Sequence, residues 1–478
     1  MSLARHTAYN LAGQLLPLVL SLLTIPIYLR LIGEARFGVM ALLWLFVGYM
    51  GLFDFGVGQA TARQLSRTES AAPNEQARVL WTALMISLAL GLVGALVAWL
   101  AGAWFFTHRA AIESGLRAEL LAALPWAAIA VPAVALTSVL NSSLQARSAF
   151  AEINLIGALT NALVLLAPLT IAATGRIELP ALVAVVACSR VLVLSLLFWR
   201  VKRKCLSAAP MTIDRRAALG LLRFGGWATV SAVVGPLLVV LDRFLIGSHL
   251  GAKAVSYYVI PFQLAERTTT LASALGYALF PRFAACTLES ERQQLGKDGL
   301  RVLSLWTSPL VAIGLMLSGP FLAWWISPEL AAQSTLVAQV LFLAFWLSSL
   351  AMVPYIKLLA TGRPDLVAKG HLLQLLPYVA LLTYALQTWG LEGAALAFAS
   401  RVVIDFLLLA HWAGFLGAAF RLLAIPSCLL LCALGIASSE GMPSVWRWAV
   451  SFALALALLA WSLVNARQSM PFSGRRHL

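Results

Sequence analysis

Apolar stretches of about 20 residues alternate along the whole chain with short segments that carry most of its polar and charged residues. An α-helix of that length crosses the roughly 30 Å of hydrocarbon in a bilayer. The pattern therefore predicts an all-α polytopic membrane protein with about fourteen transmembrane helices. The predicted helices cover residues 9–29, 37–60, 79–104, 119–140, 154–174, 179–199, 225–249, 256–280, 302–326, 334–356, 370–389, 392–412, 418–438 and 446–465.

The composition supports this assignment. Of the 478 residues, 61% are hydrophobic and only 11% are charged, and the mean hydropathy is +0.89. Such values exclude an ordinary water-soluble domain. The first apolar stretch is longer than a signal-peptide core and lacks a small-residue cleavage site, so we expect it to stay as a transmembrane helix.

The formal net charge of +15 would suggest a nucleic-acid partner in a soluble protein, but here the basic residues gather in the segments between helices. With both termini on the cytoplasmic side, 23 Lys and Arg residues lie in cytoplasmic segments and seven in the opposite loops. The positive-inside rule therefore predicts cytoplasmic termini and no nucleic-acid binding.

The longest basic loop divides the chain into two comparable parts. We predict an N-lobe (1–200), an inter-lobe loop (201–223), a C-lobe (224–413) and a final segment with two helices and a basic tail (414–478). Each lobe has six helices. The sequence Leu31-Ile32-Gly33 followed by Gly38 also matches Leu245-Ile246-Gly247 followed by Gly251.

Two parallel six-helix lobes around a central cavity suit alternating access, because rocking the lobes opens the cavity to one side at a time. Proline and glycine in the leading helix of each lobe are candidate hinges, although such residues are also common packing features. These candidates are Pro17, Pro26, Gly235 and Pro236.

Seven charged residues lie inside segments that are otherwise apolar enough to span a bilayer: Arg190, Asp242, Arg243, Glu266, Arg267, Arg401 and Asp405. Each costs about 2.5 to 3.5 kcal/mol at a helix centre on insertion scales. They must therefore contact water, a substrate or one another.

The arginines are candidate substrate-binding residues. Arg190, Arg267 and Arg401 fall near the midpoints of their predicted helices and could form a cationic belt, with Arg243 as a fourth candidate. Guanidinium groups bind phosphate oxygens in pairs and stay charged without water. The alternative is that each arginine neutralises a buried acid, as Asp405 could do for Arg401 four residues earlier.

Neighbouring charges on one helix point about 100° apart and do not face each other. The pairs Asp242-Arg243 and Glu266-Arg267 should therefore need partners on other helices, or a ligand. For Arg190 the choice lies between a phosphate and the carboxylates of Asp242 or Glu266.

The acidic residues are candidates for ion coupling. Asp242, Glu266, Asp405 and Asp54 could each take up H⁺ or Na⁺ when the cavity opens to one side and release it on the other. For Asp54 the alternative is a cap at a helix break, because glycines follow it closely.

The first 67 residues and the seventh and eighth predicted helices also carry a recognisable motif set. It comprises Asn10, Pro17, Ile25-Pro26, Tyr28, Leu31-Ile32-Gly33, Phe37-Gly38, Tyr49, Phe53-Asp54-Phe55-Gly56-Val57-Gly58, Arg63, Asp242, Ile246-Gly247 and Pro281. This set resembles the polysaccharide-transporter family of Wzx-type lipid-linked oligosaccharide flippases. That family shares a superfamily, named MOP, with the MATE drug exporters and the lipid II flippases.

The resemblance implies a function and a location. The cargo would be a polyprenyl-diphosphate-linked glycan, such as an O-antigen, capsule or exopolysaccharide repeat unit. It would move from the cytoplasmic to the periplasmic leaflet of the bacterial inner membrane. Membrane lipid, H⁺ or Na⁺, and a polysaccharide polymerase or glycosyltransferases would be the partners.

An enzyme is not expected. The chain has no HExxH or P-loop motif, and its five cysteines lack the spacing of a metal site, so we expect no metal and no cofactor. Three other functions stay open: a MATE-like antiporter for organic cations, a lipid II flippase, and a scaffold that recruits glycosyltransferases without transport.

Overall fold

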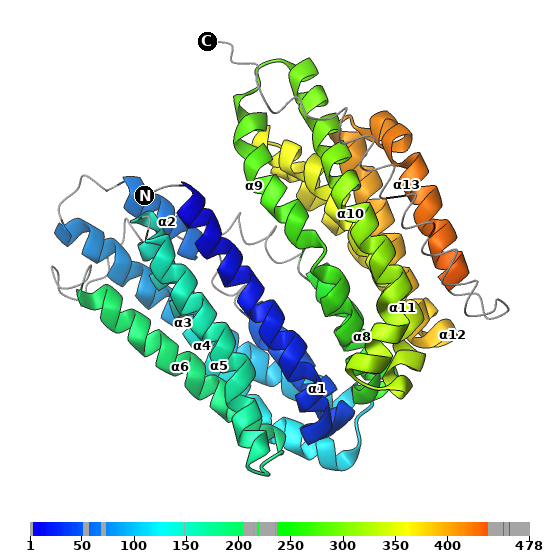
Figure 1. Cartoon of the computed structure of the whole chain (residues 1–478). Helices are drawn as coiled ribbons and strands as arrows, with labels where there is room; N and C mark the ends of the chain where they lie inside the picture. The colour runs from blue at the N-terminus through cyan, green and yellow to red at the C-terminus, as the bar shows by residue number, and fades with distance from the viewer. Residues whose placement is uncertain are drawn as a thin grey trace. The chain divides into compact units, whose positions relative to one another are not determined.

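The computed structural model describes residues 3–50, 57–67, 73–147, 149–203 and 237–437, together with the single positions 214, 218, 235, 453 and 458. Within these residues every regular element is a helix and no strand occurs (Figure 1). Eight of the described helices are long and apolar enough to cross a membrane. The predicted all-α polytopic membrane fold is confirmed.

The chain forms two compact units. The first comprises Met1–Val240 and Gly247–Ser256, and the second comprises Leu241–Ile246 and Tyr257–Leu478. The predicted lobe and linker boundaries stay a prediction, since most of residues 204–236 and 438–478 lie outside the described ranges.

The first unit contains six described helices in chain order. They are α1 (Leu3–Met50), α2 (Val57–Arg67), α3 (Pro73–His108), α4 (Ser114–Ala146), α5 (Phe150–Ala173) and α6 (Leu179–Val201). Residues 237–249 are helical and lead into α8 (Gly251–Glu266), whose residues 251–256 also belong to this unit.

The second unit continues with the rest of α8 and five further helices. These are α9 (Thr269–Ala285), α10 (Glu289–Trp325), α11 (Pro328–Ala360), α12 (Pro364–Trp412) and α13 (Leu416–Ala437). The predicted helix 446–465 lies outside the described residues apart from positions 453 and 458.

Two predicted helix pairs are each fused into one long element. α1 joins the first predicted helix to part of the second across Gly33, and α12 joins the eleventh to the twelfth across Gly390. Both glycines have positive φ angles, 79° and 59°, which cost other residues energy. A single glycine therefore turns the chain where the sequence pattern predicted a separate connection.

The predicted internal repeat aligned Gly33 with Gly247 and Gly38 with Gly251. Of these four glycines, Gly33 and Gly251 have positive φ angles, 79° and 84°, so the matching turns are offset by four residues. Each turn nevertheless follows the leading helix of its half and starts the next helix.

The start of α8 is tightly held against α1 within the first unit. The Ser256 hydroxyl donates to the Glu34 carbonyl at 2.5 Å, and the Lys253 ammonium lies 3.0 Å from the Glu34 carboxylate. A Cβ added at Gly38 would lie less than 2 Å from the Ala252 carbonyl oxygen. Only glycine fits at this contact.

We expect Gly38→Ala to destabilise the protein by at least the roughly 1–3 kcal/mol typical of overpacking, because the clash is with backbone that cannot rotate away. Thermal unfolding in detergent measures this. Gly157→Ala on α5 is the matched control, since nothing lies within 4 Å of the added methyl group. An equal melting temperature for both variants would contradict the described contact.

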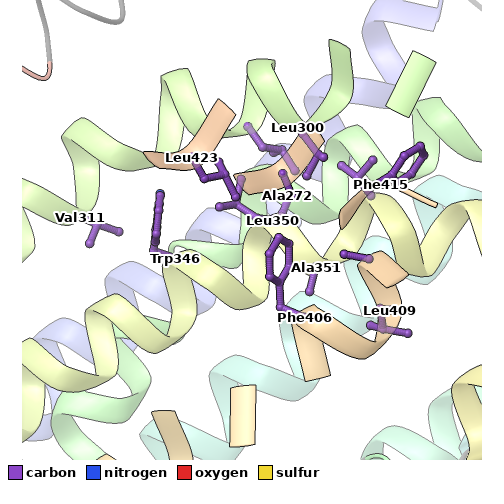
Figure 2. Packing of buried hydrophobic residues seen from close by; sticks show 14 of the residues in the cluster. Ala272, Leu300, Val311, Trp346, Leu350, Ala351, Phe406, Leu409, Phe415 and Leu423 are labelled. Atoms are coloured by element: carbon purple, nitrogen blue, oxygen red, sulfur yellow. The ribbon is translucent and has the colours of Figure 1, made fainter. Parts of the chain in front are cut away.

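The core of the second unit joins all five of its later helices. Figure 2 shows Ala272 of α9, Leu300 of α10, Leu350 of α11 and Phe406 of α12 among its buried side chains. The Trp346 indole N–H in this core donates to the Ser308 hydroxyl at 3.0 Å. The second unit therefore gives the charged residues described next a rigid, apolar support.

At one edge of this core a buried lysine fastens the connection between α12 and α13. The Lys357 ammonium donates to the Ala413 carbonyl at 2.8 Å and pairs with Glu289 at the start of α10. It also lies 4.7 Å from the centre of the Phe415 ring. This cation is fully partnered, so its role is structural.

Candidate functional site

The predicted helix 256–280 is interrupted in the structure, so the prediction of one continuous helix was wrong. α8 ends at Glu266, α9 begins at Thr269, and Arg267 and Thr268 form a turn between them. The two helices have 16 and 17 residues, each short of the about 20 needed to span a bilayer. We therefore expect the break to lie within the membrane-spanning region.

A run of three threonines explains the break. The Thr268 hydroxyl donates to the Ala265 carbonyl at 2.7 Å, and the Thr269 hydroxyl donates to the Glu266 carbonyl at 2.8 Å. The Ala265 carbonyl also accepts from the Thr268 backbone N–H at 3.1 Å, so the Thr268 hydroxyl adds a second bond to a carbonyl at the end of α8. β-branched threonines, whose hydroxyls compete for backbone groups, are the sequence signal that marks this site.

The charged residues at the break are exposed. Glu266 and Arg267 both present their side chains at the surface of the second unit, and neither forms an ion pair with a described residue of that unit. The Thr268 backbone keeps helical φ and ψ angles, −62° and −25°, so the interruption is a local turn. Charged side chains are costly against lipid tails, so the exposed Glu266 and Arg267 need water, cargo or another polar partner.

A second group of charges is fully buried in the same unit, around Asp242. This carboxylate is completely inaccessible and accepts hydrogen bonds from the Tyr258 hydroxyl at 2.8 Å and from the Arg243 backbone N–H at 2.8 Å. The Arg243 guanidinium lies 3.2 Å from the same carboxylate. Its central carbon also lies 3.5 Å from the centre of the Phe262 ring.

The expectation that Asp242 and Arg243 do not contact each other was therefore wrong. The 100° separation describes only the directions in which the two side chains leave the helix. The long arginine side chain folds back along the helix, where the Phe262 ring supports its guanidinium by a cation–π contact. The partner from another helix is Tyr258, which the sequence analysis did not identify.

Arg401 does not form the local ion pair with Asp405 that was one alternative. Its guanidinium lies over the rings of Phe398, at 5.0 Å, and Tyr378, at 5.5 Å, and its buried Nε atom has no hydrogen-bond partner. Asp242 acts on it electrostatically without a direct bond. Arg401 is thus a buried cation held mainly by aromatic rings.

Asp405 instead contacts the first half of α12. Its carboxylate accepts a hydrogen bond from the Gln374 amide at 3.0 Å and lies 3.9 Å from the His371 imidazole. Both halves of α12 face each other here because Gly390 turns the chain between them. His371 and Gln374 are further polar residues that the sequence analysis did not single out.

Arg190 lies on α6 in the first unit and is partly buried. Its Nε atom is buried without a hydrogen-bond partner, and no described carboxylate of its own unit lies within 4.0 Å of it. A mostly buried arginine without an internal counter-ion is costly unless a ligand or water compensates it.

The remaining candidates stay predictions. Asp54 and Pro236 lie outside the described residues. Pro17 and Pro26 lie inside α1, where the break falls at Gly33 rather than at either proline. Gly235 is described only as an isolated position. No group of His, Cys, Asp and Glu that could hold a metal ion occurs among the described residues.

The three arginines predicted near the helix midpoints share one property. Arg190, Arg267 and Arg401 each lack an ion pair with a described carboxylate of their own unit, whereas the off-centre Arg243 is paired with Asp242. Guanidinium groups without such an ion pair are suited to binding an anion, and of the three only Arg401 has the charge of Asp242 acting on it.

Comparison with known proteins gives one family match and one curated relative. Residues 3–286 match the model of a family described as "Polysaccharide biosynthesis protein". A Shigella flexneri protein named "Putative O-antigen transporter" is 26% identical over 411 residues, which cover 86% of this chain and 97% of that protein.

Similar solved structures come from membrane transporters. A lipid II flippase, MurJ, in an inward closed conformation gives a TM-score of 0.74 at 12% identity, with 97% of this chain and 99% of that chain covered. An inward-facing multidrug-resistance MATE transporter of the MOP superfamily gives 0.67 at 16% identity, with 89% and 96% covered. These similarities concern the fold.

Proposed function

Since this chain belongs to the polysaccharide biosynthesis protein family, we propose that it is a flippase for a polyprenyl-diphosphate-linked oligosaccharide. The cargo is an O-antigen, capsule or exopolysaccharide repeat unit, and it moves from the cytoplasmic to the periplasmic leaflet of the bacterial inner membrane. The name of the Shigella flexneri relative supports the O-antigen as the first candidate.

The observation that carries this proposal is the set of central arginines that form no ion pair with a described residue of their own unit, Arg190, Arg267 and Arg401. A diphosphate carries paired oxygens that guanidinium groups bind at two points each. A binding site for organic cations would instead contain acidic residues that lack counter-ions, rather than arginines that lack them.

The helix break adds a second anion-attracting element. Arg267 directly precedes the first turn of α9, at the positive end of the helix dipole. The Thr268 and Thr270 N–H groups here already donate to the Ala265 and Arg267 carbonyls, so the dipole and the guanidinium charge attract the anion. Anions bind readily at such helix starts, and broken helices at the membrane midplane commonly form transporter substrate sites. Arg267 is therefore the first residue we assign to the diphosphate.

Transport occurs by alternating access, with H⁺ or Na⁺ as the candidate coupling ion. Among the acids, Glu266 is exposed and Asp405 is partly exposed, so both can exchange ions with water. Asp242 is fully buried against Arg243 and Tyr258 and needs a conformational change to do so. Glu266 and Asp405 are thus the stronger coupling candidates.

This chain is a transporter and carries out no catalytic step. Its relatives are named as transporters and flippases, not as enzymes. Glycosyltransferases that complete the lipid-linked repeat unit and a polymerase that consumes it are the expected functional partners. Both termini are expected in the cytoplasm.

The proposal is tested by depleting the protein in its native cell and measuring polyprenyl-diphosphate-linked oligosaccharides by mass spectrometry. We expect one complete lipid-linked repeat unit to accumulate, and its mass identifies the glycan. Accumulation of lipid II would indicate a lipid II flippase. An unchanged lipid pool in cells without a redundant flippase would favour export of organic cations, which uptake assays would then detect.

A further inference from the structure

Two apolar cavities lie one after the other along the seam between α3 and α4 in the first unit. The first has a volume of about 330 Å³ and is bounded also by α6, with Trp81 and Phe198 among its lining residues. The second, of about 480 Å³, lies between α3 and α4 alone, with Leu96, Trp99 and Ile129 in its lining.

The two cavities belong to one groove. On α3 their lining residues recur every three or four positions from Trp81 to Trp99, so they occupy a single face of that helix. On α4 the residues from Pro125 to Leu140 do the same in the opposite direction. Between the cavities the two helices are in direct contact, since a Cβ added at Gly91 would lie 2.8 Å from the Pro132 Cα. This contact forms the bottom of the groove.

The groove is longer than the hydrocarbon thickness of one bilayer leaflet. Trp81 and Trp99 are 18 residues apart, which corresponds to about 27 Å of α-helix. This nearly equals the whole hydrocarbon thickness of roughly 30 Å, whereas the acyl chains of a phospholipid reach only about half of it. The groove therefore suits a chain longer than a phospholipid tail.

One end of the groove carries a cluster of positive charge. Exposed basic residues occur at the start of α3, at the end of α4 and at the end of α6, next to the cavity that Trp81 lines. They are Arg78, Arg147, Arg200, Lys202 and Arg203. Arg200 pairs with Glu152 at 3.4 Å and Arg147 donates to the Gln76 amide oxygen at 3.0 Å, so the net positive charge comes chiefly from the other members. This is the end predicted to face the cytoplasm, and such basic clusters attract phosphorylated lipid headgroups.

We propose that this groove binds the isoprenoid chain of the lipid-linked cargo before transport, while its diphosphate is still at the basic end and has not yet reached Arg267. The proposal rests on the function proposed above, which supplies a lipid whose chain is long and whose headgroup is anionic. The groove holds the tail in the membrane outside the first unit before the glycan is transported. Its apolar lining and its length select a long polyprenyl chain.

A photoreactive lipid tests this binding site directly. The purified protein in phospholipid nanodiscs is labelled with a long-chain polyprenyl monophosphate that carries a diazirine near the far end of its chain. Mass spectrometry then locates the labelled residues. We expect labels on α3 between Leu92 and Trp99 and on the facing part of α4, and no competition by excess phosphatidylglycerol or by short-chain geranyl phosphate.

Filling the groove should remove the labels. Ala95→Trp and, on the facing helix, Ala128→Trp each place a bulky side chain in the second cavity. Labelling should fall about tenfold, because loss of only two buried CH₂ groups has that effect on affinity. Ala101→Trp is the matched control, since Ala101 is exposed on the opposite face of α3 and lines neither cavity.

Labels elsewhere, labels that the filling variants do not reduce, or equal competition by phosphatidylglycerol would overturn the proposal. A melting temperature equal to that of the wild type confirms that each variant is folded. The labelling needs neither glycan nor transport. It can therefore fail while depletion still causes the repeat unit to accumulate, and it can succeed if the flippase function is wrong.

Discussion

Replacement of Asp242 with alanine is expected to prevent the protein from accumulating in folded form. The variant leaves Arg243, which is 3% exposed, without its carboxylate, and it removes the charge that acts on the buried Arg401. Loss of one partner of a buried ion pair costs about 3–5 kcal/mol, a large part of the roughly 5–15 kcal/mol by which a typical protein is stable. Fluorescence-detected size-exclusion chromatography of the solubilised membrane measures the folded fraction.

A second substitution distinguishes this explanation from a coupling role for Asp242. Asp242→Ala/Arg243→Met also removes the unpaired charge of Arg243, so we expect part of the folded protein to return, because apolar replacement of a buried pair is often neutral or stabilising. The return is partial because Arg401 still lacks the charge of Asp242. Tyr258→Phe removes only one hydrogen bond to Asp242 and should cost about 1–2 kcal/mol. A fully folded Asp242→Ala single variant would show that the buried pair contributes nothing to stability.

The double variant Arg190→Gln/Arg267→Gln is expected to fold and to lose almost all transport. Neither side chain pairs with a described acid of its own unit, so neutralising it leaves none of the described acids unpaired. If each arginine donates a charge-assisted hydrogen bond to the diphosphate, each single variant should lose about 1.5–3 kcal/mol of binding, or roughly ten- to more than a hundredfold. Expression of each variant in depleted cells, followed by mass spectrometry of the lipid-linked repeat unit, measures the residual transport.

The control is Arg176→Gln, an exposed arginine in the connection between α5 and α6, outside the apolar stretches. It should clear the accumulated lipid as well as the wild type does. Arg267→Lys should retain part of the activity, since an ammonium keeps the charge but cannot bind two oxygens as a planar fork. Full clearance by the double variant would exclude a diphosphate site at these residues and would suit a non-transporting scaffold.

The sequence was sufficient to predict the helices and their membrane setting, because a length of about 20 apolar residues is a strong and local signal. The predicted helix boundaries were wrong where a single glycine, rather than a loop, connects two helical segments. Gly33 and Gly390 turn the chain through a positive φ angle, and nothing in the hydrophobic pattern differs between such a turn and a short connection. The break at Arg267-Thr268 was predictable from the following threonines, but hydropathy alone hides it.

The sequence also identified which residues carry charge into the membrane, but not how they are compensated. Arg243 reaches its sequence neighbour because Phe262, contributed by α8, supports the folded-back side chain. Asp405 bonds to Gln374 rather than to Arg401 because α12 folds back on itself. Both contacts depend on how separate helical segments pack together. The spacing of residues along one helix does not reveal this packing.

The central claim is that this chain moves a polyprenyl-diphosphate-linked oligosaccharide across a bilayer. The direct measurement uses proteoliposomes that contain the purified protein and a labelled lipid-linked repeat unit, and follows the exposure of the glycan to a membrane-impermeant glycosidase. We predict rapid exposure of the lipid from the inner leaflet with the wild type, and exposure at the protein-free rate with Arg190→Gln/Arg267→Gln. Exposure at the protein-free rate with the wild type, in liposomes given either a proton or a sodium gradient, would contradict the claim.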